Sequence, residues 1–197
     1  ETETEAASEE SSEAESTADA SESDMDYVKG KGTLVVGITD FEPMDYKDAN
    51  GNWIGFDADM ATAFAESIGV KPEFVEIDWD NKILELDGKT VDCLWNGMTL
   101  TDEVKSAMST SNAYCNNAQV VIVKSDVADK YQDEESLKDL TFAVEAGSAG
   151  EAQAEALGLE YTPVKAQSDA LMEVAAGTSD AAIIDSLMAA AMVGEGT

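Results

Sequence analysis

From residue 33 onward, short runs of apolar and β-branched residues alternate with segments whose apolar residues recur at helical spacing. Runs of the first kind are typical of buried strands, and segments of the second kind are typical of helices. A strand, a helix and a second strand in one sheet usually form a parallel crossover. The alternation therefore predicts an α/β fold with mostly parallel sheets. The expected strands cover 33–38, 73–77, 91–95, 118–123, 141–144, 161–164 and 180–184.

Capping residues mark the ends of several expected helices. Asp57 and Thr101 are candidate N-caps, and the spacing of Ser148 and Glu151 matches a capping box. Gly158 and Gly177 follow helical segments directly, as is common at helix C-termini. Residues 40–52 are rich in turn formers and are expected to form a loop. The expected helices cover 57–68, 81–86, 101–108, 134–137, 148–157, 168–176 and 186–193.

The charge of the chain excludes several classes of function. Its 197 residues include 42 acidic and 11 basic side chains, a net charge of −31, and every basic residue is a lysine. Phosphates of nucleic acids and anionic membrane surfaces should repel such a chain. Because the sequence has no histidine, it offers no Ser-His-Asp triad and no histidine metal site. We expect no cofactor, no metal and no nucleic-acid partner.

The acidic charge is concentrated at the N-terminus. Residues 1–26 hold 11 acidic residues, no basic residue and one large apolar side chain, Met25. We expect this segment to be disordered, since it has little apolar surface to bury, and we expect the fold to start near Tyr27. Two interpretations stay open: a linker that tethers the domain to a surface, and a plain solubilising tail. The sequence contains no apolar run of 18 residues and no visible signal peptide.

The two cysteines, Cys93 and Cys115, fit no metal-binding spacing. They are equally consistent with one disulfide and with two buried thiols. Neither has a neighbouring base that would make it a nucleophile.

Candidate binding residues come directly after predicted strands, where parallel α/β sheets bind ligands. Aromatic rings there would cover the apolar stem of a small zwitterion, loop N–H groups would bind its carboxylate, and a carboxylate would bind its ammonium group. Each residue also has an ordinary structural interpretation, as a core aromatic, a turn or a helix cap. The candidates are Asp40, Phe41, Trp79, Asn96, Gly97, Met98, Thr99, Ser148, Ala149 and Asp185.

Three segments together resemble the extracytoplasmic solute-binding proteins of ABC importers, in their polar amino acid branch. They are Asp40-Phe-Glu-Pro43, Gly55-Phe-Asp-Ala-Asp59 and Asn96-Gly-Met-Thr-Leu-Thr-Asp-Glu103. The resemblance covers roughly residues 30–190 by order of elements. It implies a two-lobed, periplasmic-binding-protein-like fold of type II that closes on its ligand by a hinge motion.

The resemblance implies a domain organisation and a role for each candidate residue. Lobe 1 would cover 27–118, a hinge-crossing strand 119–124 and lobe 2 125–197. Phe41 and Trp79 would sandwich the ligand side chain, and Asp185 would hold its α-ammonium. Gly97, Thr99, Ser148 and Ala149 would bind its α-carboxylate. The implied protein is a monomer that serves an ABC importer permease, is extracytoplasmic, and is membrane-tethered through its acidic linker.

The sequence departs from the family pattern at three points. Val104 stands where the family usually has an arginine that pairs with the ligand carboxylate, and the adjacent Lys105 should point elsewhere because a helix turns about 100° per residue. Glu145 stands where a lysine or neutral residue is common. These two departures leave three alternatives open: a ligand without a free carboxylate, a ligand more cationic than a standard amino acid, or a carboxylate held by N–H donors alone. Family chains return to lobe 1, whereas this sequence ends at Thr197, so we expect the C-terminal part of the fold to be truncated.

Three functions compete. The first is delivery of an amino acid or amine to an importer, which we favour. The second is an enzyme on the same scaffold, similar to a cyclohexadienyl dehydratase, with Glu42, Asp78, Glu145 or Asp185 as the general acid or base. The third is an extracellular domain that senses the same ligands without transporting them.

Overall fold

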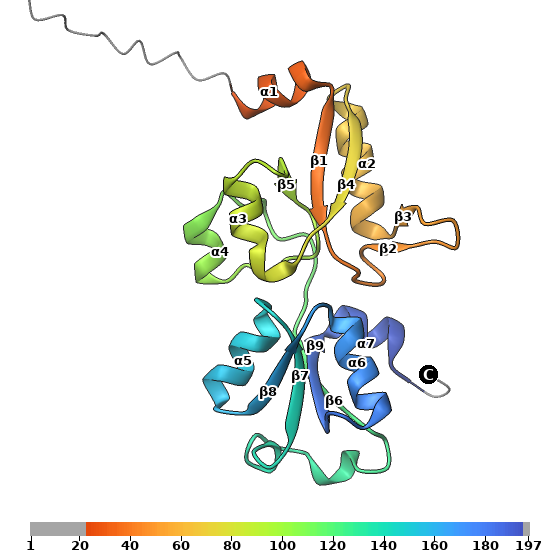
Figure 1. Cartoon of the computed structure of the whole chain (residues 1–197), viewed down its shortest axis with the longest axis vertical. Helices are drawn as coiled ribbons and strands as arrows, with labels where there is room; N and C mark the ends of the chain where they lie inside the picture. The colour runs from red at the N-terminus through yellow and green to blue at the C-terminus, as the bar shows by residue number, and fades with distance from the viewer. Residues whose placement is uncertain (1–22, 195–197) are drawn as a thin grey trace, which may run out of the picture.

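The computed structural model describes residues 23–194, which form two lobes joined by one connecting segment (Figure 1). Disorder was expected for residues 1–26; residues 1–22 lie outside the described residues, and residues 24–26 belong to a helix. The fold begins before Tyr27, because α1 (Asp24–Lys31) starts three residues earlier. Ser23 caps this helix by accepting a hydrogen bond from the Asp26 amide at 3.2 Å. In the described part of the chain, no helix has the length and apolar character needed to cross a membrane.

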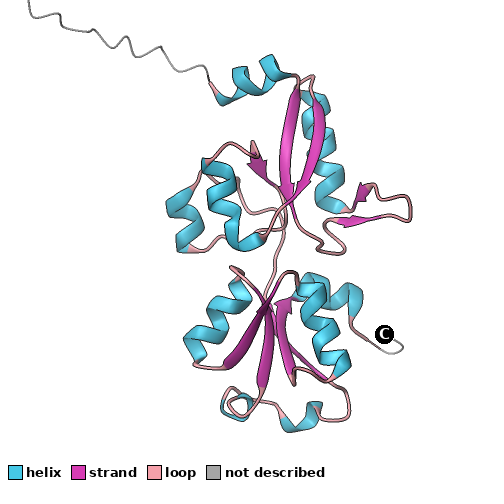
Figure 2. Ribbon diagram, viewed as in Figure 1, coloured by secondary structure: helices cyan, strands magenta, loops and turns pink. Residues whose placement is uncertain are grey.

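Lobe 1 is built on a three-stranded sheet in the order β4-β1-β5, with both pairings parallel (Figure 2). The expected strand at 91–95 is shorter than predicted, with two residues in the ladder. The lobe also has a two-stranded antiparallel ribbon, whose first strand lies inside the expected loop at 40–52 and whose second strand follows it directly. Its elements are β1 (Thr33–Ile38), β2 (Tyr46–Lys47), β3 (Trp53–Ile54), α2 (Phe56–Ser67), β4 (Lys71–Glu76), the 3-10 turn η1 (Trp79–Asn81), α3 (Lys82–Asp87), β5 (Cys93–Leu94) and α4 (Asp102–Ala107).

Lobe 2 has a four-stranded sheet in the order β6-β9-β7-β8, in which only β6 is antiparallel to its neighbour. The expected helix at 134–137 is a single 3-10 turn. The elements of the lobe are β6 (Gln119–Val123), the 3-10 turns η2 (Ala128–Lys130) and η3 (Glu135–Leu137), β7 (Thr141–Glu145), α5 (Ala149–Leu157), β8 (Glu160–Val164), α6 (Gln167–Ala176), β9 (Ala181–Asp185) and α7 (Ser186–Met192).

The sheet of lobe 2 is covered on both faces, which explains why its central strands are continuously apolar. Alternate residues of a strand point to opposite faces. Ala182 and Ile184 of β9 accordingly pack in one cluster with α6 and α7, whereas Ala181 and Ile183 pack in another with α5. This layering places α5 on one side of β7 and β9, and α6 and α7 on the other (Figure 1).

The segment that crosses between the lobes lies upstream of the predicted one. Residues 119–124 were expected to be the hinge, but β6 is an edge strand of the lobe 2 sheet, paired with β9 from Gln119–Asp185 to Val123–Ala181. The crossing is made by residues 108–118, which we call the connecting segment. Sequence periodicity identified the strand but could not identify its partner, which depends on a distant segment.

The predicted caps are partly confirmed. Thr101 accepts a hydrogen bond from the Val104 amide at 3.2 Å, and Ser148 accepts one from the Glu151 amide at 3.1 Å. Asp57 is not a cap: Gly55 is the N-cap of α2, and Asp57 is fully buried inside the first turn.

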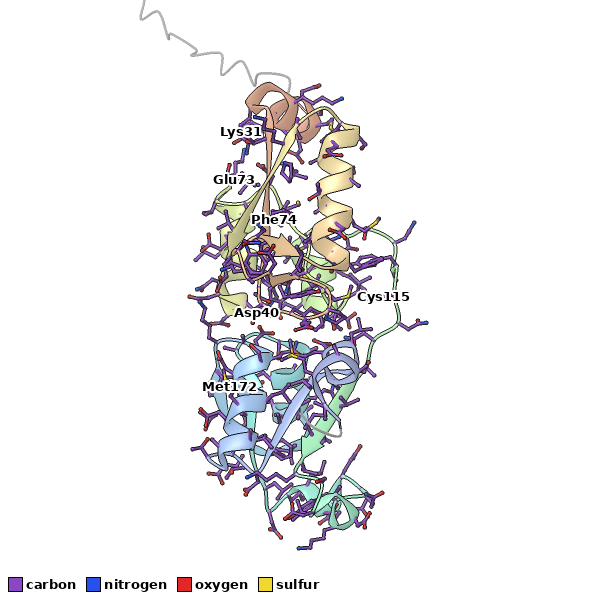
Figure 3. The ribbon with its side chains drawn as sticks, turned by 90° about the vertical axis from the view of Figure 1, so that its right-hand side faces the viewer. Lys31, Asp40, Glu73, Phe74, Cys115 and Met172 are labelled. Atoms are coloured by element: carbon purple, nitrogen blue, oxygen red, sulfur yellow. The ribbon has the colours of Figure 1, made fainter. Side chains whose placement is uncertain are left out.

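Cys93 and Cys115 are free thiols, so the possible disulfide between them is not formed. Cys93 is held in β5, and Cys115 is exposed on the connecting segment (Figure 3). The alternative of two buried thiols is not met either, because Cys93 is half-buried and Cys115 is exposed. Burial raises the pKa of the Cys93 thiol to about 12, which makes it a poor nucleophile.

Gly97 packs directly against the ring of Phe41, and together they link the loops that follow β5 and β1. Gly97 has a φ of +56°, and a Cβ at this position would lie 2.7 Å from Cε1 of Phe41. A glycine is required here for both reasons.

We predict that Gly97→Ala destabilises the protein by about 2–4 kcal/mol, because left-handed strain adds to overpacking against Phe41. Gly69→Ala is the matched control: its φ is +82° but the space for a Cβ is open, so it should cost only about 1 kcal/mol. Urea unfolding measures both values. Equal losses in the two variants would show that the Phe41 contact imposes no constraint.

Two carboxylates, Asp45 and Asp57, are fully buried side by side at the start of α2. Neither side-chain oxygen of Asp45 has a hydrogen bond of normal geometry among the described residues. Burial, and then repulsion from Asp57, raise the pKa of Asp45 to about 8, and the nearby Ala58 N–H offsets part of this shift. Asp45 is therefore a neutral acid in the folded protein at neutral pH.

This burial predicts a loss of stability as the pH rises. In the unfolded chain Asp45 ionises near its model value of 3.8, whereas in the folded chain it holds its proton to about pH 8. Between these values unfolding releases a proton, so the free energy of unfolding falls with increasing pH. We expect Asp45→Asn to flatten this decline and to raise the Tm at pH 8 by roughly 2–8 °C.

The measurement is thermal unfolding at pH 5 and pH 8. Asp59→Asn, a change at an exposed residue of α2, should leave the difference between the two Tm values unaltered. An Asp45→Asn variant with the wild-type decline would contradict the prediction.

Candidate functional site

A cavity of about 220 Å³ lies between the two lobes. Most of its lining follows the carboxyl ends of strands β1, β4, β5, β7 and β9, which is the edge where parallel sheets place their sites. Both sheets therefore point their functional edges at one space. The lining residues are Phe41, Trp79, Lys82, Asn96, Gly97, Met98, Thr99, Thr101, Glu103, Val104, Glu145, Gly147, Ser148, Ala149, Ala152, Gln167 and Asp185.

Lobe 1 contributes the two aromatic walls expected from the sequence. Phe41 follows β1 and is 3% exposed, and Trp79 follows β4 and is 7% exposed. Each also packs in a hydrophobic cluster: Phe41 belongs to the cluster that contains Ala182 and Met188 of lobe 2, and Trp79 to one with Val91 of lobe 1. Both rings therefore pack in a hydrophobic core and also line the cavity.

Asn96 lines the cavity, but its side chain is already engaged. Its Oδ1 accepts a hydrogen bond from the Thr39 amide at 2.8 Å, and its Nδ2 donates to the Thr39 hydroxyl at 2.8 Å. These bonds tie the loop after β5 to the end of β1, and so hold Gly97, Met98 and Thr99 at the cavity wall.

Lobe 2 contributes a carboxylate held by side-chain amides. Asp185, at the end of β9, accepts hydrogen bonds from the amide groups of Asn117, Gln119 and Gln167, the second at 2.7 Å. The Asp185 amide donates to Oε1 of Gln167 at 2.7 Å. Because these neighbours are neutral, they orient the carboxylate without neutralising its charge. The carboxylate is therefore suited to bind a cationic group of a ligand.

Glu145, at the end of β7, is a second buried carboxylate beside Asp185. It is 3% exposed and lies 3.5 Å from Nε2 of Gln167, measured from its Oε2. Burial raises the pKa of Glu145 to about 8; the Gln167 hydrogen bond opposes this shift and the charge of Asp185 adds to it. This shift favours the protonated form of Glu145 near neutral pH.

The N-terminus of α5 also faces the cavity. Ser148 and Ala149 line it, and the first turn of a helix leaves N–H groups without partners inside the helix. Gly150 lets the helix approach β9 closely, since a Cβ there would lie 2.9 Å from the Ile183 carbonyl oxygen. This arrangement suits a bound carboxylate.

Lys82, the first residue of α3, is a lining residue that was not among the candidates. It is 6% exposed, and its Nζ donates to the Gly147 carbonyl at 2.7 Å and to the Trp79 carbonyl at 3.3 Å. The ammonium lies 5.1 Å from the centre of the Trp79 ring. Burial lowers its pKa, and nearby acidic groups led by Glu103 oppose that shift. The one sequence feature that could have indicated Lys82 as a site residue is its position about one helical turn after Trp79.

Other contacts also hold the lobes together. Gly147 lies so close to lobe 1 that a Cβ would be 2.6 Å from Cα of Asp80. Lys165 of lobe 2 pairs with Glu76 at 3.3 Å and with Asp78 at 3.7 Å. These exposed pairs are worth little individually.

Nine of the ten candidate residues line the cavity, and Asp40 does not. Asp40 lies at the boundary between the lobes (Figure 3), where its Oδ2 accepts a long hydrogen bond of 3.4 Å from Ser168. Phe41, the next residue, lines the cavity, so the two adjacent side chains have different surroundings. Gln167, Thr101 and Glu103 join the site without having been predicted.

Val104, which stands where the family usually has an arginine, lines the cavity and is 2% exposed. Lys105 points elsewhere as expected: its side chain is 53% exposed and lies 4.0 Å from Asp102.

A larger hollow of about 810 Å³ lies within lobe 1, beneath the connecting segment. It is lined by Phe56, Trp95, Tyr114 and both cysteines, among others, and lacks converging charged groups from the two sheets. Among the described residues, the smaller cavity between the lobes is the better candidate, because polar groups from both lobes converge on it.

Comparison with known proteins agrees with this geometry. The family described as bacterial extracellular solute-binding proteins, family 3, matches residues 34–172. The arginine-binding extracellular protein ArtP of Bacillus subtilis is 33% identical over 165 residues, which span 81% of this chain and 64% of ArtP.

Two solved structures have the same fold. The ancestral amino acid-binding protein AncCDT-1, a precursor of cyclohexadienyl dehydratase, superposes with a TM-score of 0.81 at 37% identity, covering 85% of this chain and 76% of that one. Holo ArgBP from T. maritima superposes with a TM-score of 0.81 at 34% identity, covering 85% of this chain and 75% of that one. The chain therefore belongs to the bacterial extracellular solute-binding proteins of family 3 and has their two-lobed, type II periplasmic-binding fold.

Proposed function

We propose that this chain binds a cationic amino acid between its lobes and delivers it to the permease of an ABC importer on the extracytoplasmic side of the membrane. The observation that carries the proposal is that Phe41 and Trp79 from one lobe and Asp185 from the other line a single cavity. At about 220 Å³ the cavity suits one small metabolite and is below the usual range for drug-sized ligands.

The cavity offers one complementary group for each part of an amino acid. The Phe41 and Trp79 rings cover an aliphatic stem, and the Asp185 carboxylate binds an α-ammonium group. The first turn of α5 at Ser148 and Ala149, with the loop at Gly97 and Thr99, receives the α-carboxylate. A ligand that touches both lobes stabilises their closed arrangement, since it binds that state better than an open one.

The charge of the lining favours a ligand with a positive side chain. Glu103, Glu145 and Asp185 line the cavity, against one cation, Lys82. A neutral amino acid would leave Glu145 protonated, whereas a cationic side chain can pair with its ionised form. ArtP, named as arginine-binding, and ArgBP, whose holo structure superposes on this chain, support arginine as the first ligand to test.

We also infer that the protein binds its ligand without converting it, acts as a monomer, and is held at the membrane through the acidic segment of residues 1–26. Of the four carboxylates considered as general acids or bases, only Glu145 and Asp185 line the cavity. Asp78 is instead paired with Lys165 at the surface.

We predict that L-arginine raises the Tm of the chain in a concentration-dependent manner, since it binds only the folded state. Asp185→Asn should weaken binding roughly 10–100-fold by removing a charge-assisted partner of the α-ammonium. Isothermal titration calorimetry measures the affinity.

Glu160→Gln, an exposed change in lobe 2, controls for the general loss of one negative charge and should bind as the wild type does. Asp185→Asn must melt normally without ligand for the comparison to count. No Tm shift with any basic amino acid, or equal affinity in Asp185→Asn, would refute the proposed function.

We predict that arginine affinity rises about 3–10-fold between pH 6 and pH 8. A cation beside Glu145 favours its ionised form, so binding releases the proton that Glu145 holds up to about pH 8 in the empty site. Glu145→Gln should bind with little dependence on pH over this range. Titrations in buffers with different ionisation enthalpies would reveal the released proton, and an unchanged pH dependence in Glu145→Gln would contradict the assignment.

A further inference from the structure

We propose that Lys82 is the residue that neutralises the carboxylate of the bound amino acid. This inference rests on the proposed function and concerns a residue of the same cavity. An amino acid brings a carboxylate into a lining that already holds Glu103, Glu145 and Asp185, so the ligand needs a cationic partner there.

The chain offers few cations for this task. The sequence contains no arginine and no histidine. Among residues 23–194, Lys82 is the one lysine that lines the cavity. A ligand carboxylate without a cationic partner would meet only like charges and neutral donors, which is costly in a site of low polarity.

The position of the ammonium suits this role. Nζ of Lys82 donates to the Gly147 carbonyl at 2.7 Å, which holds it at the residue directly before Ser148 and Ala149. It therefore lies next to the first turn of α5, where unpaired N–H groups face the cavity. A carboxylate bound there would meet helix N–H groups from lobe 2 and a charged ammonium from lobe 1.

The Lys82 ammonium also has one N–H group that is available to a ligand. A lysine ammonium has three N–H groups, and two of them serve the Gly147 and Trp79 carbonyls, the latter at 3.3 Å. The stem of Lys82 is buried and the ammonium rests against the Trp79 ring, 5.1 Å from its centre. The third N–H is thus held in place before a ligand arrives, which lowers the entropy cost of binding.

Lys82 would consequently couple ligand binding to closure. Because it comes from lobe 1 and is anchored on lobe 2, a carboxylate placed beside it adds a contact that exists only while the lobes are together. An open arrangement would separate Lys82 from Gly147 and from the first turn of α5.

The test compares L-arginine with agmatine, which is arginine without its carboxylate, on the full chain. The wild type should bind arginine at least about 10-fold more tightly than agmatine. Lys82→Met should weaken arginine binding roughly 10–100-fold, as expected for loss of a charged hydrogen-bond partner, and change agmatine binding by less than about 3-fold. Lys82→Arg should restore most of the preference for arginine.

Lys130→Met is the matched control, because Lys130 is exposed on η2, at the end of lobe 2 away from lobe 1 (Figure 1). If Lys82 serves only to join the lobes, Lys82→Met will weaken both ligands equally, and the proposal is overturned. Unchanged arginine affinity overturns it as well. Should Lys82→Met unfold, Lys82→Gln, which keeps a donor and loses the charge, replaces it in the same comparison.

The two proposals fail in different ways. A wild-type chain that binds neither ligand overturns the proposed function and this inference with it. A wild-type chain that binds arginine, with a Lys82→Met variant that keeps the same preference over agmatine, overturns this inference alone.

Discussion

The orientation of the strands determines where everything else in this protein can act. In each lobe the parallel strands end at the edge that faces the other lobe, so loops after β1, β4, β5, β7 and β9 converge on one cavity. Strand ends supply side chains, and the helix that follows β7 supplies free N–H groups. The antiparallel strand β6 fits the same plan, since its first residue, Gln119, pairs with Asp185 at that edge.

Buried carboxylates are the second theme of the structure. Asp45 and Asp57 lie together in lobe 1, and Glu145 and Asp185 lie together in lobe 2. Burial of the first pair is electrostatically unfavourable. Neither residue of this pair lines the cavity between the lobes, so the pair does not contact a ligand bound there. The second pair is open to a ligand, so a bound cation can offset its cost. The same physical arrangement thus lowers stability in one place and favours binding in the other.

Much of the site could be predicted because it lies next to elements with strong local signals. Phe41, Trp79 and Asp185 each follow an apolar strand, and Ser148 opens a helix with a clear capping box. The features that local signals could not determine depended on contacts with other parts of the chain. The strand at 119–123 was identified, but its place in the lobe 2 sheet comes from pairing with β9, more than 50 residues later. The sequence left the pairing of Cys93 and Cys115 open, because a bridge depends on proximity, which spacing alone does not determine. Asp40 was expected in the site beside Phe41, but it does not line the cavity, and the direction of a single loop side chain is not a local sequence signal.

The sequence by itself determined the α/β class, the positions of most helices and strands, the absence of arginine and histidine, and the acidic character of the strand ends. These properties follow from local periodicity and composition, which act over a few residues. Only the tertiary structure decided that Lys82 enters the cavity, that Gln167 holds Asp185, and that Glu145 keeps a proton near neutral pH. Those outcomes depend on burial and on contacts between the two lobes, and neither exists until segments far apart in the chain pack together.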